Sequence, residues 1–362
     1  MSQTTSSTNV TLSDVAKRAG VSQSTVSRVL NRHPRISSQT SQRVFKVVEK
    51  LGYDAQAIER KAQARATRKK TRTINIETLL CPLPEQRNMM ALTHFSKMIE
   101  GIENHLSTVD LAINHISSWT VSEPDSHPKN KRVIDQLHKA DGILMMGNPS
   151  ESLIATIQRI NEKNVLLGPC SMDLKINTVT SDEIHGGQMA AKYFLDRGFT
   201  DIGFLMGSQA VRTWQENRHG AKIQTDITLG EGHFHCRYAR NTDTPEVARA
   251  FEDWILSGQC PRAVILPYVE SFLAIELVLT KHHLKCPEDF SLIAFGDNRV
   301  ESYHIKPTVL RTHPYLTGHK GSERIVQMIL DRNIAAQPHR VLIPMEILEG
   351  NSVLAQSQVE SG

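Results

Sequence analysis

The sequence predicts an α/β protein in which a small N-terminal unit of three helices precedes a larger, two-lobed body with parallel sheets. Three observations support this fold class. Apolar residues near the N-terminus recur at helical spacing around a glycine turn. From Thr73 onward, short β-branched runs alternate with amphipathic segments. Finally, 362 residues with 39% hydrophobic and 22% charged side chains suffice for more than one compact core.

Two short helices joined by a glycine turn are predicted at the start of the N-terminal unit. Gly20 ends the first helix, and Ser22 supplies the N-cap of the second. A third helix, with Ser37 or Ser38 near its start, closes the core. The apolar residues that predict the three inner faces are Leu12, Val15, Ala16 and Ala19, then Val26, Val29 and Leu30, and finally Val44, Val47, Val48 and Leu51.

The outer face of the second helix has side chains suited to reading DNA. Gln23, Ser24, Ser27 and Arg28 face away from the predicted core. The forked guanidinium of Arg28 matches the O6 and N7 atoms of guanine, and the amide of Gln23 can pair with adenine. The alternative is a small helical bundle without a DNA function, which does not explain this polar face.

Charge is distributed unevenly along the chain. Residues 1–72 carry 15 Lys and Arg against 4 Asp and Glu, whereas the remaining residues carry 27 against 34. The chain is therefore a basic head on an acidic body. So large a positive excess in one small unit favours a polyanionic partner.

The head resembles the DNA-binding headpiece of the LacI family. The run from Thr11 to Asn31 reads TLSDVAKRAGVSQSTVSRVLN, and Leu51-Gly-Tyr53 follows at the expected place. The resemblance implies that the second helix lies in the major groove of double-stranded operator DNA. It implies base reading by Gln23, Ser24 and Arg28, and backbone contacts by Thr11, Ser22, Thr25, Ser27 and Asn31.

The hinge after the headpiece departs from the family pattern. Where relatives carry Pro, Ala and Leu, this chain has Ala55, Glu59 and Ala62. Because the methyl group of Ala62 cannot unstack a base step as Leu does, we expect weaker kinking of the operator. Seven of the thirteen residues 60–72 are basic and none is acidic. The segment is expected either to form a basic helix on phosphate or to act as a flexible tether; its candidate hinge residues are Arg60, Lys61, Ala62 and Arg65.

The body alternates predicted strands and helices, as parallel sheets covered on both faces do. The predicted strands are Ile74–Leu80, Leu111–Ile116, Gly142–Met146, Val165–Leu167, Ile202–Met206, Phe234–Tyr238, Ala263–Leu266 and Ser291–Phe295. The predicted helices lie near 92–106, 129–139, 150–162, 185–197, 245–257, 269–283 and 314–332.

The family resemblance extends into the body more weakly. It is carried by Val179-Thr-Ser-Asp-Glu-Ile-His-Gly-Gly, by Leu195-Asp-Arg-Gly-Phe, and by Pro287-Glu-Asp-Phe-Ser-Leu-Ile-Ala-Phe-Gly-Asp297. It implies a periplasmic-binding-protein-like sensor of two lobes that dimerises and binds a small-molecule effector in the cleft. Headpiece and sensor together imply a homodimeric transcriptional regulator.

The expected cleft residues differ from those of sugar-binding relatives. Where those relatives place Arg, an Asn-Asp pair and Asp, this chain has Asn217, Tyr268-Val269 and Gly296. Arg218 and Asp297 sit one position along and could substitute, although a structural role is the alternative for both. Flat rings could face a sugar or another planar ligand. The candidate effector-binding residues are Trp214, Asn217, Arg218, Tyr268, Asp297 and His313.

No cofactor, metal site or catalytic constellation is expected. His233 and His235 share one face of a strand while Cys236 points away, and no carboxylate completes a ligand set. The chain has no nucleophile elbow, phosphate-binding loop or zinc-protease motif, so an enzyme is not predicted. With no apolar run long enough for a membrane span and no signal-peptide pattern, we expect a cytoplasmic protein with reduced cysteines.

The sequence thus predicts a sequence-specific DNA-binding regulator, a repressor, whose operator binding responds to a carbohydrate or a carbohydrate derivative. A ligand-independent DNA binder with a degenerate cleft is the alternative. The expected organisation is a tail at 1–9, the headpiece at 10–58, a basic hinge at 59–72, the sensor and dimerisation domain at 73–353, and a C-terminal tail at 354–362.

Overall fold

The computed structural model describes residues 12–30, 36–51, 73–82, 89–119, 128–170, 175–297, 305–331 and 337–355. The chain divides into two compact units, residues 1–72 and 73–362, and each is described by itself. Within the described ranges, no helix is long and apolar enough to cross a membrane. Six residues with predicted roles lie outside the described ones: Thr11, Asn31, Arg60, Lys61, Ala62 and Arg65.

The N-terminal unit contains the three predicted helices, α1 (Leu12–Ala19), α2 (Gln23–Leu30) and α3 (Ser38–Leu51). Gly20 adopts φ +63° and ends α1, a conformation in which a side chain would be strained. The Ser22 hydroxyl accepts a hydrogen bond from the Thr25 amide at 3.2 Å and so caps α2. The core residues are Val15, Ala16, Ala19, Val26, Val29, Val44 and Val48, as the apolar spacing predicts.

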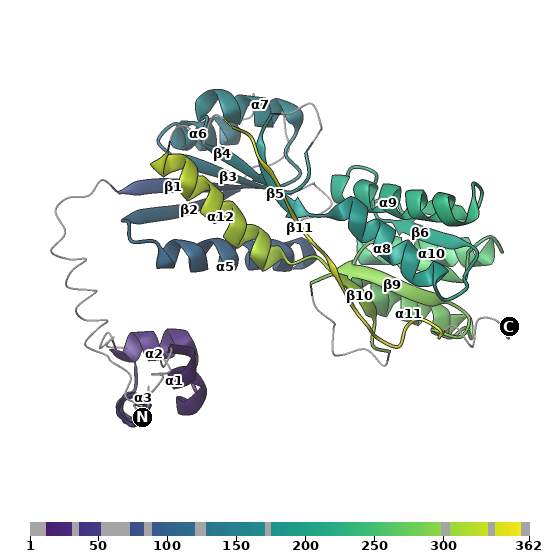
Figure 1. Cartoon of the computed structure of the whole chain (residues 1–362), viewed down its shortest axis with the longest axis horizontal. Coiled ribbons are helices and arrows are strands. Elements are labelled where there is room, and N and C mark those ends of the chain that lie inside the picture. Colours follow the sequence, from purple (N-terminus) through teal and green to yellow (C-terminus); the bar gives the residue numbers. More distant parts are fainter. Residues whose placement is uncertain are drawn as a thin grey trace, which may run out of the picture. The chain divides into compact units, whose positions relative to one another are not determined.

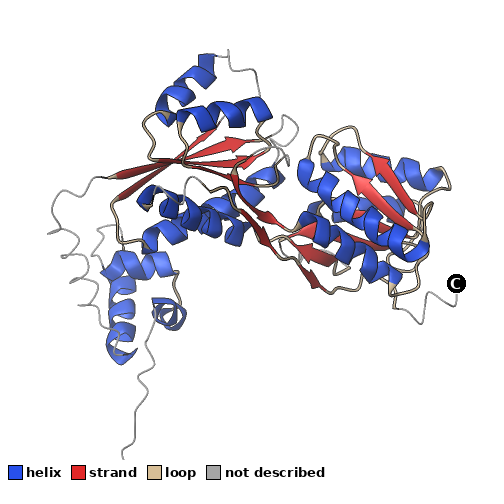
Figure 2. Cartoon of the chain, turned by 45° about the horizontal axis from the view of Figure 1, so that its top comes forward, coloured by secondary structure: helices blue, strands red, loops and turns tan. Residues whose placement is uncertain are grey.

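Residues 73–362 form two α/β lobes, each with a six-stranded sheet that has helices on both faces (Figures 1 and 2). In the first lobe the strand order is β11-β5-β4-β3-β1-β2, and every neighbouring pair is parallel. Its elements are β1 (Ile74–Cys81), α5 (Met89–Thr108), β2 (Ile113–Trp119), α6 (Pro128–Leu137), β3 (Gly142–Gly147), α7 (Glu151–Ile160), β4 (Asn164–Leu167), β5 (Asn177–Ser181), α12 (Pro314–Leu330) and β11 (Arg340–Ile343).

In the second lobe the strand order is β12-β10-β9-β8-β6-β7, and only β12 runs antiparallel to its neighbour. Its elements are α8 (Glu183–Leu195), β6 (Ile202–Met206), α9 (Arg212–Leu229), β7 (Phe234–Tyr238), α10 (Thr244–Leu256), β8 (Ala263–Leu266), the short 3₁₀ helix η2 (Val269–Ser271), α11 (Phe272–Lys281), β9 (Ser291–Gly296), β10 (Thr308–Arg311) and β12 (Glu346–Leu348).

The chain passes between the lobes three times, from β5 to α8, from β10 to α12 and from β11 to β12. The three crossings are hydrogen-bonded to one another. The Ser181 hydroxyl donates to the carbonyl oxygen of Thr312, and the Asp182 amide donates to that of Ile343 at 2.8 Å. Because these bonds join adjacent connections, the crossings form one hinge region between the lobes.

Each lobe contains a helix pair that crosses at glycine. A Cβ atom at Gly187 on α8 would overlap the carbonyl oxygen of Asn217 on α9, and one at Gly220 would overlap that of Ile184. The first lobe repeats this arrangement where α5 meets α12, a helix that follows more than 200 residues later and packs beside it (Figure 1). There, Gly101 and Gly318 approach the opposite backbone equally closely. Only glycine allows backbones to approach this closely.

The structure contains four strands and one helix that the sequence did not predict. The eight predicted strands are present, with ends shifted by at most three residues, but β5, β10, β11 and β12 were not predicted. The periodicity also did not predict α9, because this helix carries few apolar residues and packs through Gly220 and Ala221. The seven predicted helices are all present.

Candidate functional site

The predicted DNA-reading residues are in or next to α2. Val26 and Val29 occupy the inner face of this helix, so Ser24 and Arg28 fall on the opposite side by helical periodicity. The Gln23 side chain is exposed, and Ser22 is exposed at the N-cap. The three-helix core therefore places positions 24 and 28 on the side of α2 away from the core.

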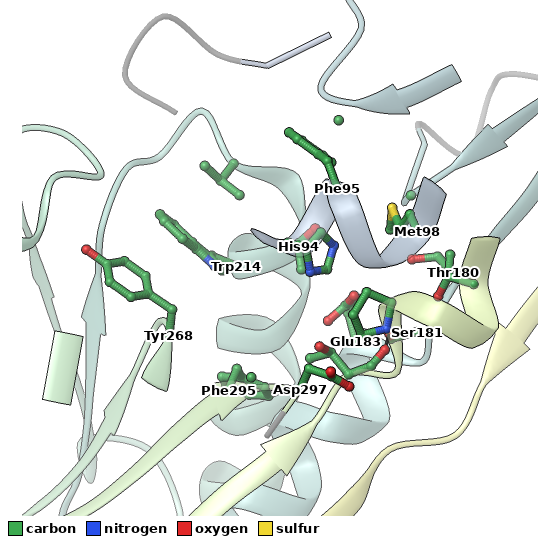
Figure 3. A pocket seen from close by; sticks show the side chains of 18 of the residues that line it. His94, Phe95, Met98, Thr180, Ser181, Glu183, Trp214, Tyr268, Phe295 and Asp297 are labelled. Carbon is green, nitrogen blue, oxygen red and sulfur yellow. Dashed lines mark hydrogen bonds between the residues drawn. The ribbon is translucent and has the colours of Figure 1, made fainter. Parts of the chain in front are cut away.

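A cavity of about 350 Å³ lies between the two lobes of residues 73–362, at the carboxyl ends of their strands (Figure 3). Ligands of open α/β sheets bind at this edge. The α5 residues His94, Phe95 and Met98 line one side, and Trp214 and Tyr268 line the other (Figure 3). Further lining residues come from the ends of β3, β4, β5, β8 and β9: Asn148, Gly168, Pro169, Thr180, Ser181, Pro267, Val269, Phe295, Gly296 and Asp297.

Two stacked aromatic rings form the second-lobe wall of the cavity. The ring centroids of Trp214 and Tyr268 are 5.6 Å apart and their planes are inclined by 30°. The Tyr268 hydroxyl donates a hydrogen bond to the carbonyl oxygen of Thr242 at 2.8 Å. Because this bond and the stacking fix both rings, the wall presents a flat, rigid apolar surface.

An ion pair spans the cavity from one lobe to the other. Lys97 on α5 contacts the carboxylate of Asp297, which follows β9. Arg311 at the end of β10 lies 3.8 Å from the same carboxylate and 2.9 Å from Glu346. A chain of alternating charges therefore leads from the first lobe through the cavity wall to the hinge.

Two buried polar side chains form a third part of the lining. Asn217 is fully buried on α9, and Glu183 at the start of α8 is 5% exposed. The Asn217 amide and the Glu183 carboxyl interact with each other. Even so, neither amide atom of Asn217 forms a well-aligned hydrogen bond with a described residue, and the same holds for Oε2 of Glu183. Burial raises the pKa of the Glu183 carboxyl well above its usual value, and the nearby Glu216 carboxylate adds to this shift.

Four of the six candidate effector residues line the cavity: Trp214, Asn217, Tyr268 and Asp297. The other two lie outside the lining. Arg218 contacts the His219 ring at 2.9 Å. His313 adopts φ +51° at the N-cap of α12, 3.8 Å from Glu346. Sequence reasoning missed Lys97, His94 and Glu183, because their positions near the cavity depend on packing between distant segments.

Of the described residues, no three His, Cys, Asp or Glu side chains are placed to hold a metal ion. A carboxylate lies near His233 and His235 without completing such a set. His235 is 3.0 Å from Asp201, and His233 is 3.7 Å from it. The five cysteines are free thiols, and Cys81, Cys170 and Cys286 are buried.

Breaking the ion pair across the cavity is expected to open the cleft. A Lys97→Met variant removes an attraction between the lobes worth about 1 kcal/mol or less, so open conformations become up to about fivefold more populated. Small-angle X-ray scattering of the unliganded protein should show a larger radius of gyration. Lys222→Met is the matched control, because Lys222 pairs with Asp226 within α9. An equal change in both variants would contradict the assigned role.

Two family models match the sequence. Residues 11–56 match the model of bacterial regulatory proteins of the lacI family, and residues 191–353 match the periplasmic binding protein-like domain. The HTH-type transcriptional repressor PurR of Vibrio vulnificus is 27% identical, with 89% of this chain and 92% of the relative covered. Catabolite control protein A of Staphylococcus epidermidis is 24% identical, with 92% and 97% covered.

Solved structures share the fold. The Lac repressor dimer bound to operator and the anti-inducer ONPF has a TM-score of 0.67 and 18% identity, covering 96% of this chain and 99% of that one. The complex of the transcriptional regulator CelR with cellobiose has a TM-score of 0.63 and 18% identity, covering 95% and 99%. Both similarities extend over the N-terminal unit and the two-lobed body.

Proposed function

Because this chain belongs to the LacI family of bacterial regulatory proteins, it is a DNA-binding transcriptional regulator, and we propose that its α2 helix reads a palindromic operator. The observation that carries this proposal is the packing of α2 in the three-helix core, which leaves positions 24 and 28 on the side away from that core. The protein acts as a homodimeric repressor that responds to a small molecule. Its operator target implies that it works in the cytoplasm.

Each headpiece residue has a role in this proposal. Gln23, Ser24 and Arg28 contact base edges in the major groove, where each base pair presents a distinct pattern of donors and acceptors. The backbone of the operator is held by Thr11, Ser22, Thr25, Ser27 and Asn31, together with the basic segment that includes Arg60, Lys61, Ala62 and Arg65. Since many of these contacts are to phosphate, operator affinity should fall steeply as salt rises.

The interlobe cavity is the proposed effector site. Its position at the carboxyl ends of both sheets and its rigid Trp214–Tyr268 wall suit a small ring compound, and we propose a carbohydrate or a carbohydrate derivative. The CelR structure holds cellobiose, which supports this ligand class by analogy alone. Lobe closure around the effector would change the spacing of the two headpieces in the dimer.

Selection from a random DNA pool by the full-length protein tests the proposed function. We expect a palindromic consensus, whose enrichment changes when one member of a library of sugars, sugar phosphates and nucleosides is added. Failure to enrich any sequence, with or without the library, would contradict the proposal.

A second candidate is a DNA binder that needs no effector. The observation in its favour is the ion pair of Lys97 with Asp297, which joins the lobes across the cavity in the unliganded protein. In that case the pool would yield the same consensus under every condition, and no library compound would raise the melting temperature.

The exposed apolar face of α11 is the proposed contact between the two copies of the homodimer. Leu273 and Leu277 lie four residues apart on this helix and are 46% and 63% exposed. A Leu277→Glu variant is expected to weaken the dimer by about 2 kcal/mol or more, because it places a charge in an apolar contact. Sedimentation at decreasing protein concentration measures the change. Ile227→Glu on α9 serves as the control, being 75% exposed on another helix, and similar dissociation of both variants would reject this face.

A further inference from the structure

The charges around the cavity do not suit an anionic ligand. Among the described lining residues, Lys97 is the single lysine and there is no arginine. Lys97 already contacts Asp297, while Glu183 and Glu270 add two further carboxyl groups. The His94 side chain is exposed, and an imidazole carries only part of a positive charge at neutral pH. Among the described lining residues, a phosphate ester would meet no unpaired lysine or arginine.

Asn217 and Glu183 interact with each other and have further hydrogen-bonding capacity that the protein does not use. Their side chains lie next to each other where α8 crosses α9, and both line the cavity. Three of their polar atoms are closed off from solvent and form no well-aligned hydrogen bond with a described residue: Nδ2 and Oδ1 of Asn217, and Oε2 of Glu183. A buried polar atom without a hydrogen bond destabilises the folded protein, so a ligand that pairs these atoms is favoured.

The surroundings of Glu183 favour its uncharged form. Glu216 on α9 and Asp182 at the N-cap of α8 are the charged groups that act on it, and both are acidic. The guanidinium groups of Arg212 and Arg340 act instead on Glu216. Burial and the two neighbouring carboxylates raise the pKa of Glu183 well above its usual value, although a hydrogen bond with Asn217 acts in the opposite direction. The balance favours the protonated carboxyl.

We propose that the effector is an uncharged ring compound bearing hydroxyl or amide groups, and that the side chains of Asn217 and Glu183 form the polar edge that recognises it. This inference rests on the proposed function of the cavity and narrows its ligand class. The ring packs against the Trp214–Tyr268 wall, and its polar groups meet the Asn217 amide and the Glu183 carboxyl. Small side-chain rotations, common on binding, bring the enclosed polar atoms to the ligand.

Glu183 is therefore a specificity-determining residue that the sequence did not reveal. As an acid it both donates and accepts a hydrogen bond, and Asn217 does the same through its amide. A neutral polyol, sugar or nucleoside presents matching donors and acceptors. An anionic ester would bring its negative charge close to three carboxyl groups of the lining, those of Asp297, Glu270 and Glu183. The pKa of Glu183 is raised, so this carboxyl already disfavours a negative charge.

The protonation of Glu183 is tested first, on the full-length protein without ligand. In the wild type the stability that depends on neutral Glu183 is fully present below its unfolded pKa and is lost as pH rises through the raised folded pKa. A Glu183→Gln variant keeps the shape and cannot ionise. The melting temperature of the variant minus that of the wild type should therefore increase as pH rises above the pKa of an unfolded glutamate.

Glu231→Gln is the matched control, because Glu231 is exposed in the loop after α9. Its melting temperature should follow that of the wild type at every pH. A difference between Glu183→Gln and wild type that does not change with pH would overturn the assigned protonation state.

The ligand class is tested with D-ribose, D-glucose and adenosine against their phosphate esters, each pair at equal concentration. At least one neutral compound should raise the melting temperature of the wild type and of Glu183→Gln, and its ester should not. Glu183→Leu preserves a buried side chain but removes the hydrogen bonds, so affinity for that compound should fall about tenfold or more. An ester that binds more tightly than its parent, or no binding by any neutral compound, would overturn the proposal.

The two proposals fail separately. Enrichment of a palindromic consensus from the DNA pool supports the regulator function whichever compounds bind. Loss of the pH dependence or of the preference for neutral compounds, with the consensus intact, overturns the ligand assignment alone.

Discussion

An Arg28→Ala variant is expected to lose about 1–3 kcal/mol of operator binding per half-site while its binding to random DNA stays almost unchanged. Arg28 falls on the side of α2 opposite Val26 and Val29, the residues that anchor this helix to its core. A guanidinium in the major groove forms two hydrogen bonds with guanine, which alanine cannot replace. Because a homodimer uses two half-sites, the loss at a full operator is about 30-fold or more.

Competition binding with the selected operator and with scrambled DNA measures this prediction. Lys46→Ala is the control, since Lys46 is an exposed cation of the same three-helix unit, on α3 instead of α2. The Lys46→Ala variant should bind the operator and scrambled DNA slightly more weakly, and to the same extent. A uniform loss in Arg28→Ala would mean that Arg28 contacts phosphate, and the base-reading role would be rejected.

A Gly187→Ala variant is expected to destabilise the second lobe by about 1–3 kcal/mol, and a Gly187→Val variant by more. The added Cβ would overlap the carbonyl oxygen of Asn217, which belongs to the backbone of α9. The two helices must then move apart, because backbone atoms cannot rotate out of the way as a flexible side chain does. The move also displaces Asn217 from the cavity wall, so effector affinity should fall together with stability.

Thermal unfolding of both variants measures the first effect, with a decrease in melting temperature of several degrees expected. His185→Ala is the control, because His185 is an exposed residue two positions earlier on α8. Its melting temperature should stay near that of the wild type. If Gly187→Ala were as stable as wild type, the close approach of the helices would not be a feature of the folded protein.

The headpiece could be predicted from the sequence because its signals are local. Spacing of apolar residues, Gly20 and the Ser22 cap each act within a few residues, and the three helices are confirmed. In the body, strands with continuous apolar runs, such as Ile202–Met206, were also predicted correctly. These strands are buried on both faces, so composition alone identifies them.

Elements that depend on distant partners were not predicted. The strands β11 and β12 lie at sheet edges and have exposed or half-buried residues, so their apolar runs are weak. The strand β5 contains the buried polar residues Asn177 and Thr180, so it lacks the continuous apolar run that identifies a buried strand. Each of these strands is held in place by pairing with a neighbour that the local sequence does not specify.

The cavity was predicted in outline but not in detail. Family position indicated Asn217, Tyr268 and Asp297, all of which line it. It also indicated His313, which lies outside the lining. The partner of Asp297 is Lys97, 200 residues earlier in the chain, and no spacing rule connects two such residues.

The first lobe can be completed only late in synthesis, because two of its elements come from the C-terminal part of the chain. The first lobe begins with β1, yet its helix α12 and its edge strand β11 come from residues 314–343, after most of the second lobe. During synthesis the first sheet therefore leaves the ribosome with one face covered by α5 alone and with an unpaired edge. It stays in that state until the second lobe has been translated, so this nascent lobe is a natural client for chaperones that shield apolar surface.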